Sequence, residues 1–240
     1  MTVSSALQGH IQAVEQASSA LALLEATRAL AHHLASLQGA AAGSPDGPEA
    51  ADAAEPEQQA AAIACLVQVL GFNNPGAAVA AVDGLIALGA AAVEPLLQRL
   101  DPRNYGARAW AVRALAGIGD VRGLELLEEA LASDVGPSVR RAAACGLGNL
   151  RLNTVTEALR PTVRARALEA LVAGGRDGEW VVRYAVAVGL EALVQRMQPD
   201  PQERQRALRA LEVLADVEAE DTPVVRLRAS MAQQRLLITP

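Results

Sequence analysis

Four stretches of the chain share one pattern, in which an arginine lies near the start of an apolar, alanine-rich run. They read GARAWAVRAL, SVRRAAACGL, VVRYAVAVGL and VVRLRASMAQ, and the shared arginines are Arg108, Arg140, Arg183 and Arg226. Successive arginines are 32, 43 and 43 residues apart. A further copy, AAVAAVDGL, has Ala78 at the arginine position. Self-similarity at this spacing indicates a repeat protein, in which each unit buries its apolar face against its neighbours.

Each copy follows a second apolar run with helical spacing, so every unit contains two helices. Hydrophobic residues make up 51% of the chain but aromatic residues only 2%, which favours close-packed, alanine-rich helices over a β-domain. Loops rich in helix-breaking residues separate the runs, at 71–76, 101–104, 133–137, 174–178 and 218–223. We therefore predict an all-α fold, a right-handed α-α superhelix of HEAT repeats, with about five helix pairs over residues 58–237.

Two other segments precede the repeats. Residues 1–38 have apolar residues at helical spacing and are predicted to form an N-terminal helical cap. Residues 39–57 read GAAAGSPDGPEAADAAEPE, a composition that buries too little apolar surface to offset the entropy lost on ordering. We predict a flexible insertion there.

Charge and composition exclude several classes of function. The net charge of −6 disfavours a nucleic-acid-binding surface, and no apolar stretch reaches the roughly 18 residues that a membrane span needs. The first residues lack the pattern of a signal peptide, so we expect a cytoplasmic protein. Cys65 and Cys145 lie in apolar runs and are expected to be buried and reduced. No His/Cys group has metal-ligand spacing, so no metal site is predicted.

An acidic residue lies six positions before three of the shared arginines, in the pairs Asp134–Arg140, Asp177–Arg183 and Glu220–Arg226. An acid in the turn and an arginine one helical turn later can form a ladder of ion pairs between neighbouring repeats. The same acids can accept hydrogen bonds from amides at the helix start. Arg108 fits less regularly, because Asp101 lies seven residues before it.

The second helix of each unit carries unusual residues on another face. Aligning the repeats places Asp83 and Arg113 at one position, with Ala80 and Trp110 three residues earlier on the same helix face. On a concave side, these residues would line a groove that suits a flat, apolar ligand with acidic substituents. The alternative is that Trp110 packs between repeats and that Asp83 and Arg113 form a local ion pair. The spacing does not decide between the two.

Aromatic side chains recur at the starts of the second helices. Tyr105 and Trp180 each lie three residues before their arginine, and Tyr184 is close to Trp180. These rings could border a binding cleft or fasten the turn to the preceding helix. Both interpretations stay open.

Four stretches are more specific than a generic repeat: LGFNNPGAAVAAVDGLIALG at 70–89, NYGARAWAVRALAGIGD at 104–120, SVRRAAACGLGNL at 138–150 and EWVVRYAVAVGLEAL at 179–193. They resemble the phycobilin lyases of the E/F type, and in particular the F subunits of the phycocyanin α-subunit phycocyanobilin lyases. The resemblance covers roughly residues 58–197. The 39–57 insertion and the tail after Pro199 depart from the family pattern.

The resemblance implies a subunit of an enzyme that joins an open-chain tetrapyrrole, through a thioether, to a cysteine of a phycobiliprotein α or β subunit. The bilin is then the substrate, and no cofactor is expected. The resemblance also implies an E-type lyase subunit as heterodimer partner. Relatives that isomerise the bilin carry a His–Cys pair, and this chain has no His–Cys dipeptide, so we expect ligation without isomerisation.

The same resemblance suggests roles for single residues. Asp83 would favour the protonated, more electrophilic bilin, Arg108 and Arg113 would bind propionates, and Tyr105 and Trp110 would stack on the rings. The remaining predicted bilin-binding residues are Asn74, Trp180 and Tyr184. Two other functions are considered, a non-catalytic chaperone for a phycobiliprotein or its bilin, and a HEAT-repeat adaptor.

Overall fold

The computed structural model describes residues 3–42, 54–98 and 103–238, and these segments contain helices and no β-strand. The α-helices are α1 (Val3–Glu15), α2 (Ala20–Ala42), α3 (Ala54–Val69), α4 (Pro75–Leu88), α5 (Ala90–Gln98), α6 (Tyr105–Ile118), α7 (Leu124–Ser133), α8 (Pro137–Gly148), α9 (Arg160–Gly174), α10 (Trp180–Met197), α11 (Pro201–Ala215) and α12 (Pro223–Ile238). Three short 3-10 helices lie between them, η1 (Val121–Gly123), η2 (Leu152–Thr154) and η3 (Glu157–Leu159).

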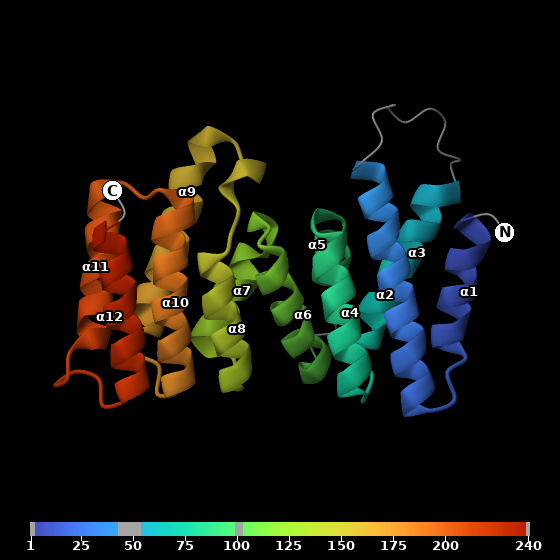
Figure 1. Ribbon diagram of the computed structural model, residues 1–240, viewed down its shortest axis with the longest axis horizontal. Helices are drawn as coiled ribbons and strands as arrows, with labels where there is room; N and C mark the ends of the chain where they lie inside the picture. The colour runs from blue at the N-terminus through green and yellow to red at the C-terminus, as the bar shows by residue number, and fades with distance from the viewer. Residues whose placement is uncertain (1–2, 43–53, 99–102, 239–240) are drawn as a thin grey trace. The chain divides into compact units, whose positions relative to one another are not determined.

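The chain forms two compact units, Met1–Ala114 and Leu115–Pro240, with the boundary inside α6. In the first unit α1 packs on α2 and α3, α2 on α4, and α5 on α3 and α4. In the second unit α8, α10 and α12 lie side by side in one layer, and α7, α9 and α11 form a layer behind them (Figure 1). Within the pairs α3/α4, α7/α8, α9/α10 and α11/α12 the first helix packs on the second, which is the arrangement predicted for HEAT repeats.

The second helices of the repeats begin at equivalent residues, as the alignment predicts. Each helix starts three residues before the shared position, so its fourth residue is the repeated arginine or, in α4, Ala78. Three of these helices begin with proline, whose fixed φ and missing N–H suit the first helical position. The other two begin with Tyr105 and Trp180.

The predicted ladder of ion pairs is present in the second unit. Arg140 binds the Asp177 carboxylate through Nε (2.7 Å) and a terminal nitrogen (3.0 Å), and Arg183 binds Glu220 in the same way (2.6 and 2.8 Å). Each arginine also donates to the backbone carbonyl of the acidic residue six positions before it. The ladder therefore joins each turn to the next repeat as well as to its own helix.

The acidic residues of the ladder also hold the turns, as predicted. The Asp177 carboxylate accepts a hydrogen bond from the Glu179 amide at 2.8 Å, and the Glu220 carboxylate accepts one from Thr222 at 2.9 Å. Hydrogen bonds from Arg183 outweigh the opposing effect of burial and lower the pKa of Glu220 to about 2. Burial raises the pKa of Asp177, but the bonds from Arg140 and Glu179 bring it below the ordinary value. Both acids are thus held ionised.

Glycines bring the helices of the second unit unusually close together. A Cβ on Gly148 of α8 would lie 2.6 Å from the Cα of Gly189, and one on Gly189 of α10 would lie 2.5 Å from the Ala144 carbonyl oxygen. No side chain fits in either space, so α8 and α10 cross backbone against backbone.

The predicted insertion is helical at both ends. Helix α2 continues to Ala42 and α3 begins at Ala54, so the predicted cap extends beyond residue 38 and the first repeat helix begins before residue 58. Alanines at both ends of the segment explain this, because alanine has the highest helix propensity. The centre of the predicted insertion, residues 43–53, lies outside the described residues.

Candidate functional site

The face predicted to form a groove carries Trp110 and Arg113 in the first unit. The Arg113 guanidinium lies over the Trp110 indole, with Cζ 5.8 Å from the ring centroid, a distance typical of a cation–π contact. Arg113 is exposed and Trp110 half-buried. One helical turn of α6 therefore presents a ring and a charge together, although a ligand is not needed to explain why they meet.

Asp83 is exposed on α4, and no ion pair joins it to Arg113 among the residues that the structure describes. The predicted local ion pair is therefore absent from the described contacts. The exposed edge of α4 runs through Val79, Asp83 and Ala87, whereas Ala80 is buried. Ala80 was predicted to share a helix face with Asp83, and the structure places it beside the exposed edge, with its side chain buried.

Asn74 has a structural role at the start of α4. Its Oδ1 accepts a hydrogen bond from the Ala77 amide at 3.0 Å, and its Nδ2 donates to the Ala20 carbonyl at 2.8 Å. Asn104 does the same for α6, where Oδ1 accepts from Ala107 at 3.0 Å and Nδ2 donates to Gly71 at 3.4 Å. Both asparagines cap a helix and tie it to an earlier segment. A role of Asn74 toward a bilin stays a prediction.

The aromatic residues at the helix starts are open to solvent. Tyr105 and Trp180 are each 46% exposed, while Tyr184 is half-buried one turn into α10. Arg108 is half-buried on α6. Tyr105 and Arg108 belong to the first unit, and Trp180 and Tyr184 to the second. The predicted residues thus form two groups, each on its own unit.

Both thiols are poor nucleophiles. Burial raises the pKa of Cys65 to about 11, and Glu15 contributes in the same direction. Burial likewise raises the pKa of Cys145, against the opposing charges of Arg141 and Arg228. At neutral pH both groups stay protonated, which argues against either as an attacking group.

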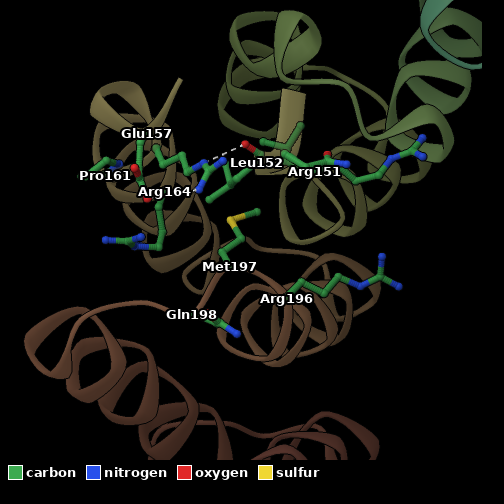
Figure 2. Close-up of a pocket in the computed structure, with 11 residues that line it drawn as sticks. Arg151, Leu152, Glu157, Pro161, Arg164, Arg196, Met197 and Gln198 are labelled. Carbon is green, nitrogen blue, oxygen red and sulfur yellow. Dashed lines mark hydrogen bonds and ion pairs between the residues drawn. The ribbon is translucent and has the colours of Figure 1, made fainter. Parts of the chain in front are cut away.

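A cavity of about 650 Å³ lies in the second unit, and it was not predicted from the sequence. Its walls come from the segment after α8, the first turn of α9 and the end of α10 (Figure 2). Four of the lining residues are arginines, namely Arg151, Arg160, Arg164 and Arg196. Three of these four arginines lie within residues 151–164, and this cluster could have indicated the site from the sequence. The arginines follow no repeat spacing, however.

In the described ranges no group of three or more His, Cys, Asp or Glu side chains could hold a metal ion. None of the helices that the structure describes is both long enough and apolar enough to cross a membrane.

Comparison with known proteins places the chain in a family. HEAT repeats match at residues 48–148 and 93–191. The phycocyanin alpha phycocyanobilin lyase CpcF of Synechocystis sp. is 47% identical over 188 residues, which is 78% of this chain and 77% of the relative. The phycocyanobilin lyase subunit beta of Thermosynechococcus vestitus is 43% identical over 233 residues, 95% of each chain. The bilin biosynthesis protein RpcF of Synechococcus sp. (strain WH8020) is 49% identical over 178 residues, covering 73% and 81%.

Solved structures agree. One chain in the complex of CpcE and CpcF of phycocyanin lyase from Nostoc sp. PCC7120 is 44% identical, with a TM-score of 0.64 over 72% of this chain and 98% of that one. A designed armadillo repeat protein, 18% identical with a TM-score of 0.55 over 98% of this chain, shares the fold alone. Given relatives of this identity over most of both lengths, the chain belongs to the HEAT-repeat phycobilin lyases of the E/F type and, within them, to the F, or beta, subunits.

Proposed function

We propose that this chain is the F-type half of a heterodimeric lyase that attaches phycocyanobilin to a cysteine of a phycobiliprotein subunit. The observation that carries the proposal is the identity of 43% to a phycocyanobilin lyase subunit over 95% of both chains. An E-type subunit is the partner, and the cytoplasm is the place of the reaction. The bilin is the substrate, and the proposal requires no resident cofactor.

The reaction is an addition in which the acceptor protein supplies the nucleophile. The cysteine sulfur of the acceptor bonds to the exocyclic carbon of the bilin, the carbon–carbon double bond is consumed, and the thiol proton ends on the tetrapyrrole. No oxidant or reductant is needed. The raised pKa values of Cys65 and Cys145 support this division of labour, because neither thiol of this chain would compete with the acceptor thiolate.

The chain's contribution is to hold the bilin in a reactive, extended form. Trp110 and Arg113 offer a ring and a cation to a flat, conjugated acid, and Asp83 is an exposed carboxylate on the neighbouring repeat in sequence. A carboxylate near the pyrrole nitrogens favours the protonated bilin, which is the better electrophile. Fixing the ligand in one orientation reduces the entropy lost in the attack. Because the chain has no His–Cys dipeptide, we propose ligation without isomerisation.

Co-expression tests the proposal. The chain is produced with enzymes that make phycocyanobilin, an E-type subunit, and either an α or a β phycobiliprotein subunit, with each component omitted in turn. Covalent, zinc-fluorescent product is expected on one acceptor only when both lyase subunits are present. Product that does not depend on this chain would refute the proposal. Bilin binding without covalent product would indicate a chaperone, and an unchanged bilin spectrum would indicate an adaptor.

A further inference from the structure

The arginine cavity of the second unit lies between segments from two consecutive repeats. Arg151 follows α8, Arg160 and Arg164 lie in the first turns of α9, and Arg196 is near the end of α10. Figure 2 shows the Met197 side chain in the middle of the lining residues. The lining residues come from separate elements of one unit, and the side chains of Arg151 and Arg196 extend away from Met197 on the same side of the view (Figure 2).

The charge of this cavity is opposite to that of the whole chain. Its walls carry four arginines and one carboxylate, Glu157, which is 93% exposed, whereas the chain has a net charge of −6. A second acid, Glu203, pairs with Arg164 from behind, and both side chains of that pair are largely buried. Two cationic groups are left in excess, so the cavity attracts anions.

The arginines retain most of their hydrogen-bonding capacity. Each guanidinium has five N–H donors, and within the described part of the chain each of the four makes a single hydrogen bond. Arg151 donates to the Ile118 carbonyl, Arg160 to Leu152 at 3.2 Å, and Arg196 to Asn149 at 2.8 Å. Arg164 uses Nε for Glu203. Arg160 and Arg164 bond through Nε, and a terminal nitrogen of Arg160 lies 3.8 Å from the Glu157 carboxylate. Arg151 and Arg196 each use one terminal nitrogen and keep the other, so all four side chains still have N–H groups that can donate to a carboxylate.

The remaining walls and the volume describe the ligand. Leu150, Leu152, Pro161 and Met197 make part of the lining apolar. A volume of about 650 Å³ far exceeds an inorganic ion and falls in the range of small-molecule pockets, roughly 300–1,000 Å³. The start of α9 also faces the cavity with no side-chain cap, and a helix N-terminus favours negative charge. The fitting ligand is an apolar molecule with more than one carboxylate.

We propose that this cavity is a second bilin site, which binds the two propionates of an open-chain tetrapyrrole and holds its rings against Leu152 and Met197. The cavity itself indicates an apolar dicarboxylate, and the choice of a bilin from that class rests on the proposed function. Arg160 and Arg196 are the specificity-determining residues, because they come from different helices and so receive separate carboxylates. Arg164, held by its ion pair with Glu203, is a positioning residue.

Biliverdin, which has two free propionates, and its dimethyl ester, which has none, are the probes. Binding is measured by absorbance titration on the full chain co-purified with its E-type partner. The double variant Arg160→Gln/Arg196→Gln is compared with Arg209→Gln, which removes one exposed charge from α11 outside the cavity. Both arms are repeated in an Arg113→Ala background, so that binding at the α6 face does not mask the result.

The double variant is expected to bind biliverdin about tenfold more weakly or worse, because charge-assisted hydrogen bonds are lost. Arg209→Gln should bind as the parent does, and the ester should bind weakly to every variant. Unchanged affinity in the double variant, or tight binding of the ester, overturns the proposal. Weaker binding of the acceptor phycobiliprotein with normal biliverdin binding also overturns it, and assigns the cavity to an acidic protein surface.

Two controls keep the outcomes distinct. Circular dichroism and thermal melts check folding, and if the double variant unfolds, Arg196→Gln alone carries the test at an exposed side chain. Ligation yield is measured on the same proteins. If the parent complex ligates the bilin but binds biliverdin no better than its ester, only the cavity site is overturned. If the parent complex binds biliverdin through its carboxylates but does not ligate the bilin, only the proposed function is overturned.

Discussion

Arg140 on α8 makes a two-pronged contact with Asp177, a residue 37 positions later in the turn before α10. Arg183 repeats the contact with Glu220, again 37 positions later. Three consecutive repeats are therefore joined by two bonds of the same kind at the same sequence separation. Because the acid also holds its own turn, each pair links the local structure of one repeat to the packing of the next.

Removing an arginine of the ladder should destabilise the second unit. Arg140→Ala and Arg183→Ala each leave a largely buried carboxylate without its cation, and we expect a loss of roughly 1–3 kcal/mol in the free energy of unfolding. Chemical unfolding followed by circular dichroism measures the loss. Arg209→Ala, at an exposed position on α11, is the matched control and should be close to neutral. Equal stabilities of all three variants would contradict the structural role of the ladder.

The ladder also predicts how stability depends on pH. The pKa of Glu220 is lowered from 4.5 to about 2 in the folded chain, chiefly by Arg183, whereas in the unfolded chain it returns to its ordinary value. The folded state is then favoured fully above about pH 4.5, and this contribution is lost as the pH falls toward 2. Glu220→Gln should flatten the fall in stability over that interval. A variant with the parental pH profile would show that other groups dominate.

Gly189→Ala should weaken the contact between α8 and α10. The new methyl group would lie 2.5 Å from the Ala144 carbonyl oxygen, so the helices must separate, at a cost of about 1–3 kcal/mol. Gly178→Ala is the control, since a Cβ there meets no atom within 4 Å. Thermal melts of both variants should differ clearly, and matching melting temperatures would contradict the close helix crossing.

Substitutions on the exposed faces of α4 and α6 should weaken bilin binding or transfer without lowering the stability of the chain. Arg113 is exposed, so Arg113→Ala should melt as the parent does but bind phycocyanobilin about tenfold more weakly. Asp83→Asn should keep the bilin yet reduce the absorbance band of its protonated form and slow its transfer to the acceptor. If both variants instead melt much lower and bind bilin normally, the two residues serve the packing of the first unit alone.

Neither cysteine should be needed for ligation. Both thiols have raised pKa values, so Cys65→Ala and Cys145→Ala should leave the yield of covalent bilin unchanged when folding is intact. Mass spectrometry of trapped intermediates offers a second measurement. A bilin adduct on either cysteine would reverse the proposed division of labour between this chain and its acceptor.

The sequence was most informative where the interactions are local. The ladder was predictable because an acid and an arginine lie six residues apart in three of the copies, and the helix starts because a proline or an aromatic residue recurs at one position. The family followed from the motifs around residues 70–89 and 104–120.

The other features depend on contacts between residues far apart in the sequence, which no regular spacing indicates. Asn74 is an N-cap whose second bond reaches back 54 residues to Ala20, and neither residue indicates the other in the sequence. The arginine cavity draws on residues from 150 to 198 with no common period. Asp83 and Arg113 occupy equivalent positions in their repeats, yet no ion pair joins them among the described residues. Only the fold could show this.

The equal spacing of the ladder has a consequence for the origin of the cavity. Helix α8 has 12 residues and α10 has 18, yet both of their arginines reach an acid 37 positions ahead. The shorter α8 is followed by the segment 149–159, which bounds the cavity together with the end of α10. A repeat of this chain thus exchanges helix for loop without altering the register of its neighbours. A recess could arise or be filled at one edge of such a protein while the opposite edge, which holds the repeats together, stayed as it was.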